Sequence, residues 1–371
     1  MELTPALSGE SFTVYNGDCR EVLAQLPEGS INCCVTSPPY WGLRDYGTAD
    51  WEGGDPDCEH TISMPTKWND PKRGTQVLRP EVANRGGDAD ACHLCGAQRI
   101  DYQIGLEKTP DEFIEEMVGV FREVRRALRD DGVLWLNLGD SYAGNNSRAS
   151  NGGRAGFGNP RETVANRSGE GLKPKDLVGI PWQVALALRN DGWYLRQDII
   201  WHKPNPLPES VKDRCTKAHE YIFLLSKSPH YYFDADAIKE PSVYAGDNRG
   251  ARTDSRRGTK MNSVSGTTGE YKNKRSVWTV PTRPYKGSHF AVFPPDLIEP
   301  CILAGCPEDG VVLDPFGGSG TTVAVSILNN RKGMAIELNP DYLPLIDKRI
   351  HEAINQRNEL DNQLSLFTEF S

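Results

Sequence analysis

The stretch that most restricts the fold of this chain lies near its C-terminus, where GVVLDPFGGSGTTVAVSILNNRKGMAIEL spans residues 310–338. An apolar strand ends in Asp314, a glycine-rich turn follows, and the chain passes into a helix and a second strand that ends in Glu337. Glycines after a strand let the backbone approach a ligand closely, and an acid at the end of the next strand is placed to accept hydrogen bonds from ribose hydroxyls. The stretch predicts a strand–helix–strand unit with a nucleoside ligand at its edge, and a purely structural turn is the alternative.

The rest of the chain repeats this alternation of strands and helices. A strand–helix–strand pattern occupies residues 12–36, and a helix that starts with a capping box at Thr109 and Glu112 precedes a buried strand, VLWLNLGD, at 133–140. Strands that alternate with helices form sheets covered on both faces. The sequence therefore predicts the α/β class, with a doubly wound and mostly parallel sheet.

A second constraint is the heptapeptide VTSPPYW at residues 35–41. The prolines cannot donate to a sheet ladder, so the strand has to end here. Ser37 and the carbonyl of Pro38 offer two rigidly held acceptors for the two N–H donors of an exocyclic amine on a nucleobase, and Tyr40 is placed to stack on a base that has left the duplex. Trp41 either extends that surface or packs beneath it. An amine-binding strand end favours S-adenosylmethionine over NAD as the nucleoside ligand, and a proline-rich turn with core aromatics is the alternative.

On these two motifs, the chain resembles the DNA amino-methyltransferases, which transfer a methyl group from S-adenosylmethionine to N4 of cytosine or N6 of adenine. Their catalytic signature, (Asp/Asn/Ser)-Pro-Pro-(Tyr/Phe), reads Ser37-Pro38-Pro39-Tyr40 in this chain, and their cofactor signature, Phe-x-Gly-x-Gly, reads Phe316-Gly317-Gly318-Ser319-Gly320. The catalytic motif comes first, which is the order of the permuted β group. The resemblance covers most of the chain and implies the S-adenosylmethionine-dependent methyltransferase fold and base flipping.

The resemblance also implies roles for single positions. Glu337 would bind the ribose hydroxyls, Asp18 would lie near the adenine amine, and the segment WHKPNP at 201–206 is similar to a strand-edge element near the target base. The expected catalytic residues are Ser37, Pro38, Pro39 and Tyr40, and the expected cofactor-binding residues are Asp18, Asp314, Phe316, Gly317, Gly318, Ser319, Gly320, Thr321, Glu337, His289, Phe290 and Phe293.

The residue at position 37 decides which amine we expect as the target. In this family, motifs of the TSPPY type occur mostly in cytosine enzymes and Asp-Pro-Pro-Tyr occurs mostly in adenine enzymes. A hydroxyl and a carboxylate both accept from an amine, so the physical difference is small. We expect transfer to cytosine N4 in duplex DNA, with adenine N6 as the alternative. Two other classes are weaker: an NAD-dependent oxidoreductase gives Ser37–Tyr40 no role, and a non-catalytic DNA-binding protein leaves the cofactor motif unused.

Cysteines and histidines are grouped in the irregular segment between the first strands and the capped helix. Cys58 and His60 form one pair, and Cys92 and Cys95 form a second pair that is followed by Gly-Ala. Four soft ligands in two such pairs are typical of a structural zinc site, and a long loop with little apolar content needs such a metal to be ordered. We expect a structural zinc here, with His93 as a substitute ligand and unrelated thiols as the alternative.

The distribution of charge points to DNA, although the net charge is −9. Residues 249–286 contain ten Lys or Arg and two Asp or Glu, and residues 144–175 contain six and two. Basic stretches of this kind are either solvated loops or segments that bind phosphates. We expect double-stranded DNA as partner, with these contact candidates: Arg249, Arg252, Arg256, Arg257, Lys260, Lys272, Lys274 and Arg275.

The chain therefore divides into six parts. We expect the catalytic-motif part of the methyltransferase domain at 10–48, a Cys/His insertion at 49–107, the continued domain at 108–204 with a Gly/Arg-rich loop at 144–175, a target-recognition region at 205–287, the cofactor-binding part at 288–357 and a flexible tail at 358–371.

The tail ends in QLSLF, which resembles the peptide with which bacterial replication and repair proteins dock on the sliding clamp. The anchors would be Gln363, Leu364, Leu366 and Phe367, and the alternatives are packing on the chain's own domain or a chance match. No stretch approaches the ~20 apolar residues of a membrane span, and we expect no secretion signal because the first residues lack a basic and an apolar region. With nine scattered cysteines, the chain is expected to be cytoplasmic, in a bacterium or phage, with reduced thiols.

Overall fold

The computed structural model describes residues 3–42, 48–61, 65–69, 76–80, 91–143, 172–242, 270–282 and 293–369. Residues 144–171 of the Gly/Arg-rich loop and residues 243–269 of the basic region lie outside the described part. Within that part, no helix is both long and apolar enough to cross a membrane.

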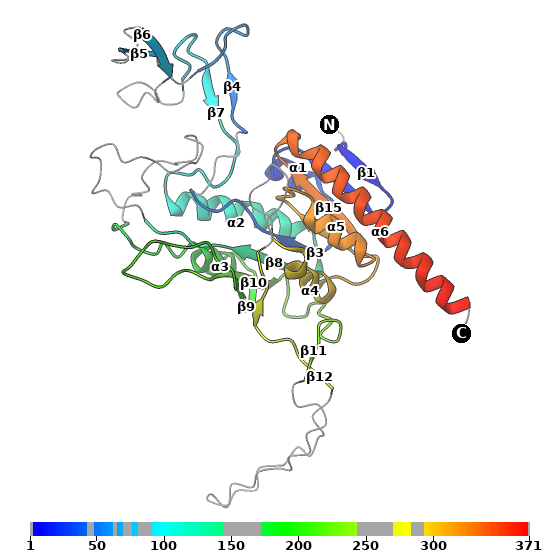
Figure 1. Cartoon of the computed structure of the whole chain (residues 1–371). Coiled ribbons are helices and arrows are strands. Elements are labelled where there is room, and N and C mark those ends of the chain that lie inside the picture. The colour runs from blue at the N-terminus through cyan, green and yellow to red at the C-terminus, as the bar shows by residue number, and fades with distance from the viewer. Residues whose placement is uncertain are drawn as a thin grey trace, which may run out of the picture.

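A nine-stranded mixed sheet forms the centre of the molecule (Figure 1). Its strands, in spatial order, are β1 (Leu7–Gly9), β2 (Phe12–Asn16), β15 (Lys332–Glu337), β14 (Val311–Asp314), β3 (Ile31–Thr36), β8 (Leu128–Leu138), β10 (His219–Ser226), β9 (Tyr194–His202) and β13 (Val277–Thr279). From β2 to β8 all neighbours are parallel, whereas β1 and β10 run antiparallel to their neighbours. The carboxyl ends of five strands therefore meet at one edge, which is where ligands bind in open α/β sheets.

Helices cover both faces of this sheet, as predicted. One face carries α1 (Cys19–Gln25), α2 (Pro110–Ala127) and α3 (Ile180–Asn190), and the other carries α4 (Pro295–Gly305), α5 (Thr321–Leu328) and α6 (Leu343–Glu369). Successive residues of a strand point to opposite faces, so Cys34 of β3 packs with the first set and Cys33 packs with α4. The prediction of a doubly wound, mostly parallel sheet is confirmed.

The helix α2 shows how the sequence encodes such packing. Thr109 accepts a hydrogen bond from the backbone N–H of Glu112 at 3.2 Å, and Glu112 accepts one from the backbone N–H of Thr109 at 3.1 Å, so the predicted capping box is formed. The apolar stripe that follows it, with Phe113, Met117 and Phe121, is fully buried against the sheet. Burial of each such side chain contributes about 1.5–3 kcal/mol.

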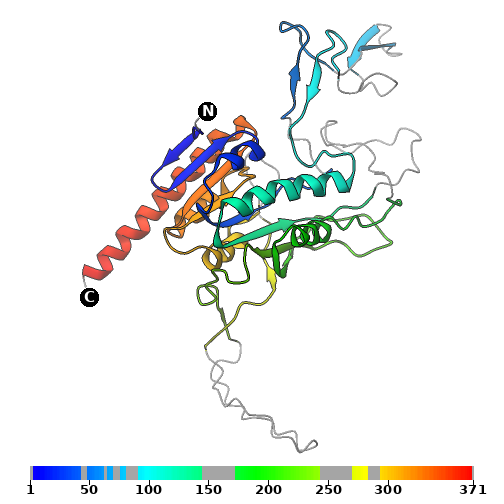
Figure 2. The same cartoon turned by 180° about the vertical axis from the view of Figure 1, so that it is seen from behind.

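The Cys/His insertion projects from the body of the molecule, on a stem formed by β4 (Asp50–Glu52) and β7 (Gln98–Ile100) (Figures 1 and 2). Beyond the stem, β5 (Pro65–Asn69) pairs with β6 (Gln76–Pro80). A further small sheet, β11 (Glu240–Pro241) with β12 (Tyr271–Lys272), flanks the basic segment.

The C-terminal part differs from the prediction. Where the sequence predicts a flexible tail from residue 358, α6 continues to Glu369, which the outward-pointing red helix in Figure 1 shows. No Gly or Pro interrupts this stretch, so nothing in the sequence stops the helix that begins after the short turn η1 (Pro340–Tyr342).

Candidate active site

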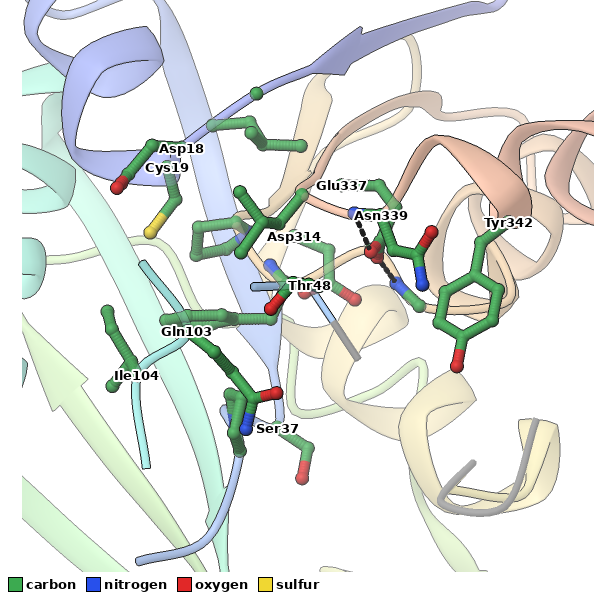
Figure 3. A pocket seen from close by; sticks show the side chains of 18 of the residues that line it. Asp18, Cys19, Ser37, Thr48, Gln103, Ile104, Asp314, Glu337, Asn339 and Tyr342 are labelled. Atoms are coloured by element: carbon green, nitrogen blue, oxygen red, sulfur yellow. Dashed lines mark hydrogen bonds between the residues drawn. The ribbon is translucent and has the colours of Figure 1, made fainter. Parts of the chain in front are cut away.

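A cavity of about 880 Å³, open mouth included, lies at the carboxyl edge of the parallel strands. It is formed by the ends of β2, β3, β14 and β15 together with chain segments on either side of the insertion's stem. Figure 3 shows Glu337, Asn339 and Tyr342 on one side of this cavity and Asp18, Cys19 and Ile104 on the other.

Glu337 lies at the end of β15 and is 8% exposed. The backbone N–H of Gly318 donates to one carboxylate oxygen at 2.6 Å, and that of Asn339 donates to the other at 2.8 Å (Figure 3). Burial raises the pKa of this carboxyl to about 7, although these hydrogen bonds act in the opposite direction. Both oxygens keep a lone pair, so the ionised group is able to accept from two neighbouring hydroxyls of a ligand.

Asp314 also borders the cavity but is occupied by internal contacts. Its carboxylate accepts from the hydroxyls of Thr36 and Thr322, both at 2.6 Å, and from the backbone N–H of Phe316 at 3.1 Å. Burial raises its pKa to about 6 against these hydrogen bonds. Asp314 therefore joins the end of β3 to the start of α5, and it lines the cavity at this junction.

The glycine turn has the backbone that the ligand hypothesis requires. Gly318 and Gly320 have φ of 52° and 75°, in the left-handed region that side chains avoid. A side chain on Gly317 would come within 3.0 Å of Ala335 on the neighbouring strand. Ser319 is buried, and its hydroxyl accepts from Arg349 at 2.8 Å. Of the residues predicted to bind the cofactor in this turn, Phe316, Ser319, Thr321 and the glycines at 317 and 318 line the cavity, whereas Gly320 does not.

Asp18 lies on the opposite side and caps α1, because its carboxylate accepts from the backbone N–H of Arg20 at 2.8 Å. The Arg20 guanidinium also binds Asp18, with an N–O distance of 2.5 Å. It donates in addition to the backbone carbonyl of Tyr102 at 3.2 Å. Sequence reasoning found Asp18 and missed the arginine that orients it, although the two are only two residues apart.

Several other lining residues were not predicted: Gly17, Cys19, Thr48, Tyr102, Gln103, Ile104, Asn339 and Tyr342. Asn339 and Tyr342 directly follow the strand that Glu337 ends, so their position was available as a signal. Thr48 and residues 102–104 flank the stem of the insertion, and no periodicity in the sequence places them at the edge of the sheet. Of the predicted pocket residues, Phe293 lines the cavity, whereas His289 and Phe290 lie outside the described residues.

The SPPY segment borders the same cavity. Ser37 and Pro39 line it, Pro38 is buried, and Tyr40 is half-buried. Trp41 is 3% exposed and its indole N–H donates to the carbonyl of Glu107 at 2.9 Å, so it packs beneath the segment and is not part of a stacking surface.

Residues from two adjacent strands hold the Tyr40 hydroxyl. It donates to Glu220 of β10 at 2.8 Å and lies 3.2 Å from the amide oxygen of Asn137 on β8. Glu220 also pairs with Lys203, which follows β9 within the WHKPNP segment. The ring of Tyr40 lies against Gly139, where a Cβ atom would come within 2.4 Å of it. The WHKPNP segment is thus linked to the SPPY segment through Glu220, a residue that sequence reasoning missed.

The four predicted metal ligands come together in the insertion. The ligand atoms of Cys58, His60, Cys92 and Cys95 all lie within 4.8 Å of one another. Nδ1 of His60 is 3.2 Å from Sγ of Cys95, and the two sulfur atoms of Cys58 and Cys92 are 3.9 Å apart. His93, named as a substitute, is exposed and is not in this group.

Three of the predicted DNA contacts lie in the described part. Lys272, Lys274 and Arg275 surround the carboxylate of Glu240 at 3.9, 3.8 and 3.3 Å. Arg249, Arg252, Arg256, Arg257 and Lys260 lie outside the described residues. Of the predicted clamp anchors, Gln363 is exposed, and the backbone of residues 363–367 is helical as part of α6.

Comparison with known proteins gives consistent matches over most of the chain. The family model for DNA methylases matches residues 31–348. The chain is 40% identical to the type II methyltransferase M.Cfr9I of Citrobacter freundii over 341 residues. This aligned region covers 91% of this chain and 87% of that protein. It is 42% identical to the type II methyltransferase M.SmaI of Serratia marcescens over 345 residues. Here the aligned region covers 92% of this chain and 91% of that protein.

Two solved structures share the fold. The PvuII DNA methyltransferase (cytosine-N4-specific) matches with a TM-score of 0.54 and 18% identity, over 95% of this chain and 94% of that one. TTHA0409 of Thermus thermophilus, a putative DNA modification methylase solved with S-adenosyl-L-methionine, matches with a TM-score of 0.51 and 21% identity, over 92% and 93%. At these identities the likeness concerns the fold alone.

Proposed function

The chain belongs to the N6/N4 DNA methylase family, and we propose that it is a site-specific methyltransferase that transfers a methyl group from S-adenosylmethionine to N4 of cytosine in duplex DNA. The observation that carries this proposal is that the SPPY segment and the acid-lined nucleoside site open into one cavity. A methyl donor and an acceptor amine would therefore meet without any further rearrangement of the sheet.

The cavity fits S-adenosylmethionine by the chemistry of its donors and acceptors. Glu337 would accept from the ribose hydroxyls, and Asp18, which Arg20 holds, would lie near the adenine amine on the opposite side. When bound, the cofactor supplies an electrophilic methyl group on a sulfonium. The backbone turn over Gly317–Gly320 leaves room for the amino-acid part, because its glycines carry no side chains.

On the acceptor side, Ser37 Oγ and the Pro38 carbonyl accept from the two N–H groups of the target amine. These bonds pull electron density toward a nitrogen whose lone pair is otherwise conjugated into the ring. Held in this way, the nitrogen would take the methyl group that the cofactor supplies, S-adenosylhomocysteine would be left, and one amine proton would pass to water. Tyr40, held by Glu220 and Asn137, offers its ring to a base that has left the stack.

Cytosine is favoured over adenine by Ser37, since a neutral hydroxyl stands where many adenine enzymes have an acid. Adenine N6 is the second candidate. The test is to incubate the protein with labelled S-adenosylmethionine and varied duplexes, digest to nucleosides and identify the labelled species. N4-methylcytosine supports the proposal, N6-methyladenine selects the second candidate, and absence of label from every nucleoside excludes both.

Variants of the SPPY segment test the site assignment. We expect Ser37→Ala and Tyr40→Ala to lower the rate of methyl transfer by about 10²-fold or more. S-adenosylhomocysteine should still bind, because the acids assigned to its ribose and adenine, Glu337 and Asp18, are unchanged in both variants. Lys348→Ala, at an exposed lysine on α6, serves as the control. Full activity of both SPPY variants would remove the assignment.

Three further parts of the chain are assigned by proposal. The four-ligand group of Cys58, His60, Cys92 and Cys95 would hold a structural zinc ion. The basic region at 205–287, including the cluster around Glu240, would contact the DNA backbone. QLSLF at the end of α6 would dock on a sliding clamp; binding of a labelled C-terminal peptide to purified clamp, with a Leu366→Ala peptide as control, tests this.

A further inference from the structure

The Cys/His cluster has the geometry of a closed, structural metal site. Its four ligand atoms come from two chain segments that meet beyond the β4–β7 stem. Gly96, which directly follows Cys95, has a φ of 78°. The backbone N–H of Thr61 donates to Sγ of Cys92 at 3.4 Å. Three sulfurs and one imidazole nitrogen at this spacing suit tetrahedral Zn²⁺, whereas Ca²⁺ and Mg²⁺ prefer oxygen ligands.

The cluster is joined directly to the stem. The ring of His60 lies 5.1 Å from that of Trp51, which is the central residue of β4. In the stem, Trp51 is paired with Arg99. A side chain on Gly54 would come within 2.7 Å of Sγ of Cys95, so the chain leaving β4 is packed tightly on the ligands.

The other end of the stem forms one wall of the cofactor cavity. Thr48 precedes β4 and Tyr102–Ile104 follow β7, and all of them line the cavity. Figure 3 labels Thr48, Gln103 and Ile104 among them. Asp101 ties the two sides together, because it accepts from the hydroxyl of Thr48 at 2.9 Å and from the backbone N–H of Gln103 at 3.1 Å.

The same wall reaches the SPPY segment. The backbone N–H of Gly42 donates to the carbonyl of Gly105 at 2.6 Å, and a side chain on Gly105 would come within 3.2 Å of Pro39. On the opposite side, Arg20 connects the carbonyl of Tyr102 to Asp18. The wall thus lies against the SPPY segment at Pro39 and is linked to Asp18 through Arg20.

We propose that Zn²⁺ bound by Cys58, His60, Cys92 and Cys95 sets the affinity for the cofactor by ordering the β4–β7 stem and, through it, the wall formed by Thr48 and residues 102–105. A three-residue, two-stranded ribbon is at best marginally stable by itself, and among the described residues near the cluster only Cys92 and Ala97 are buried. A bound metal would supply the missing order. This inference rests on the proposed function of the cavity as the S-adenosylmethionine site.

The test measures metal content and cofactor-product binding, and requires no methyl transfer. The purified full-length protein is analysed for zinc, and its affinity for S-adenosylhomocysteine is measured by calorimetry before and after removal of metal with a chelator, and after zinc is restored. We expect about one zinc per chain, about tenfold weaker binding after removal, and recovery on restoration, which is a typical size for coupling between two sites.

Two sets of variants separate the metal from the wall. Cys58→Ser and Cys95→Ser should lose zinc and bind S-adenosylhomocysteine about as weakly as the metal-free protein, whereas His93→Gln should keep both properties. Asp101→Ala should keep zinc but still weaken binding, because it removes the acceptor that joins Thr48 to Gln103 without touching a ligand. Circular dichroism of each variant reports whether the central sheet stays folded.

The outcomes are distinct. Fresh protein without zinc overturns the inference, and so does zinc-free, folded protein that binds S-adenosylhomocysteine as tightly as before. An Asp101→Ala variant with unchanged affinity overturns the proposed route through the stem. Zinc-loaded protein that does not bind S-adenosylhomocysteine at all contradicts the proposed function of the cavity instead, and overturns the coupling with it.

Discussion

At the scale of single residues, the site depends on acids that are buried more deeply than surface acids usually are. Glu337 and Asp314 lie at the ends of neighbouring parallel strands, and burial raises the pKa of each. Their hydrogen bonds distinguish them: Asp314 is committed to two threonine hydroxyls and a backbone N–H, whereas both bonds to Glu337 come from the backbone of the cavity itself. The sequence shows two acids at strand ends but not which of them faces the ligand.

The raised pKa of Glu337 gives a pH-dependent affinity. The ionised carboxylate is the form that accepts from two ribose hydroxyls, so affinity for S-adenosylhomocysteine should fall as pH drops below about 7, by up to about tenfold per pH unit. Calorimetric titration from about pH 5.5 to about pH 8.5 measures this. Glu337→Gln should bind weakly at every pH, and a pH profile identical to wild type in that variant would contradict the assignment.

The same shift predicts the sign of an effect on stability. The folded-state pKa of about 7 lies above the ordinary 4.5, so Glu337 favours the folded state below about pH 4.5 and this contribution is lost as pH rises through 7. In the absence of ligand, Glu337→Gln should therefore raise the melting temperature at pH 8 more than at pH 5. Thermal unfolding of the variant and the wild type at the two pH values checks this. If the substitution changes the melting temperature equally at both pH values, burial does not penalise the charge of Glu337.

At the scale of elements, the acceptor side of the site is built by strands that are neighbours in the sheet but distant in the chain. Tyr40 follows β3, Asn137 belongs to β8 and Glu220 belongs to β10, and these strands are adjacent in that order. Local pattern predicted the strands themselves, because their apolar runs are long. It could not predict that β10 inserts antiparallel between β8 and β9, which is what brings Glu220 to Tyr40.

This arrangement predicts that Tyr40 and Glu220 act as a unit. Tyr40→Phe keeps the aromatic face but loses the hydroxyl anchor, and Glu220→Gln loses the charge that pairs with Lys203. Each variant should lower methyl transfer by about tenfold at saturating cofactor, and the double variant should lower it little further, since groups that share one interaction are not additive. Unchanged affinity for S-adenosylhomocysteine is the control, and fully additive losses would show that Glu220 does not position the tyrosine.

At the scale of the whole molecule, the sequence revealed the fold and both motifs but not the wall of the cavity. The strand–turn–helix unit around Asp314 and the SPPY segment carry local signals, since their turns and prolines dictate backbone conformation. Thr48, Gln103 and Ile104 reach the site only because an insertion with no periodicity leaves and rejoins the sheet edge there. None of these three residue types by itself indicates a ligand site, so only the tertiary structure shows that they line the cavity.

Charge at this scale predicts how the protein holds DNA. The chain has a net charge of −9, yet the paired strands β11 and β12 gather Lys272, Lys274 and Arg275 around the single acid Glu240, at the base of the basic segment. Three cations around one carboxylate leave two charges for phosphates. Replacing all three by Ala should make this slope, which is negative, less steep by about 0.9 for each phosphate that the variant no longer neutralises. Here the slope is that of log affinity for DNA against log salt concentration. Glu240→Gln should instead tighten DNA binding at low salt.

Filter binding to duplex DNA across a salt series measures both effects. The control is Lys348→Ala on α6, an exposed lysine beside Glu352. If the triple variant keeps the wild-type slope and loses only thermal stability, the cluster serves to neutralise Glu240 and the phosphates are bound elsewhere.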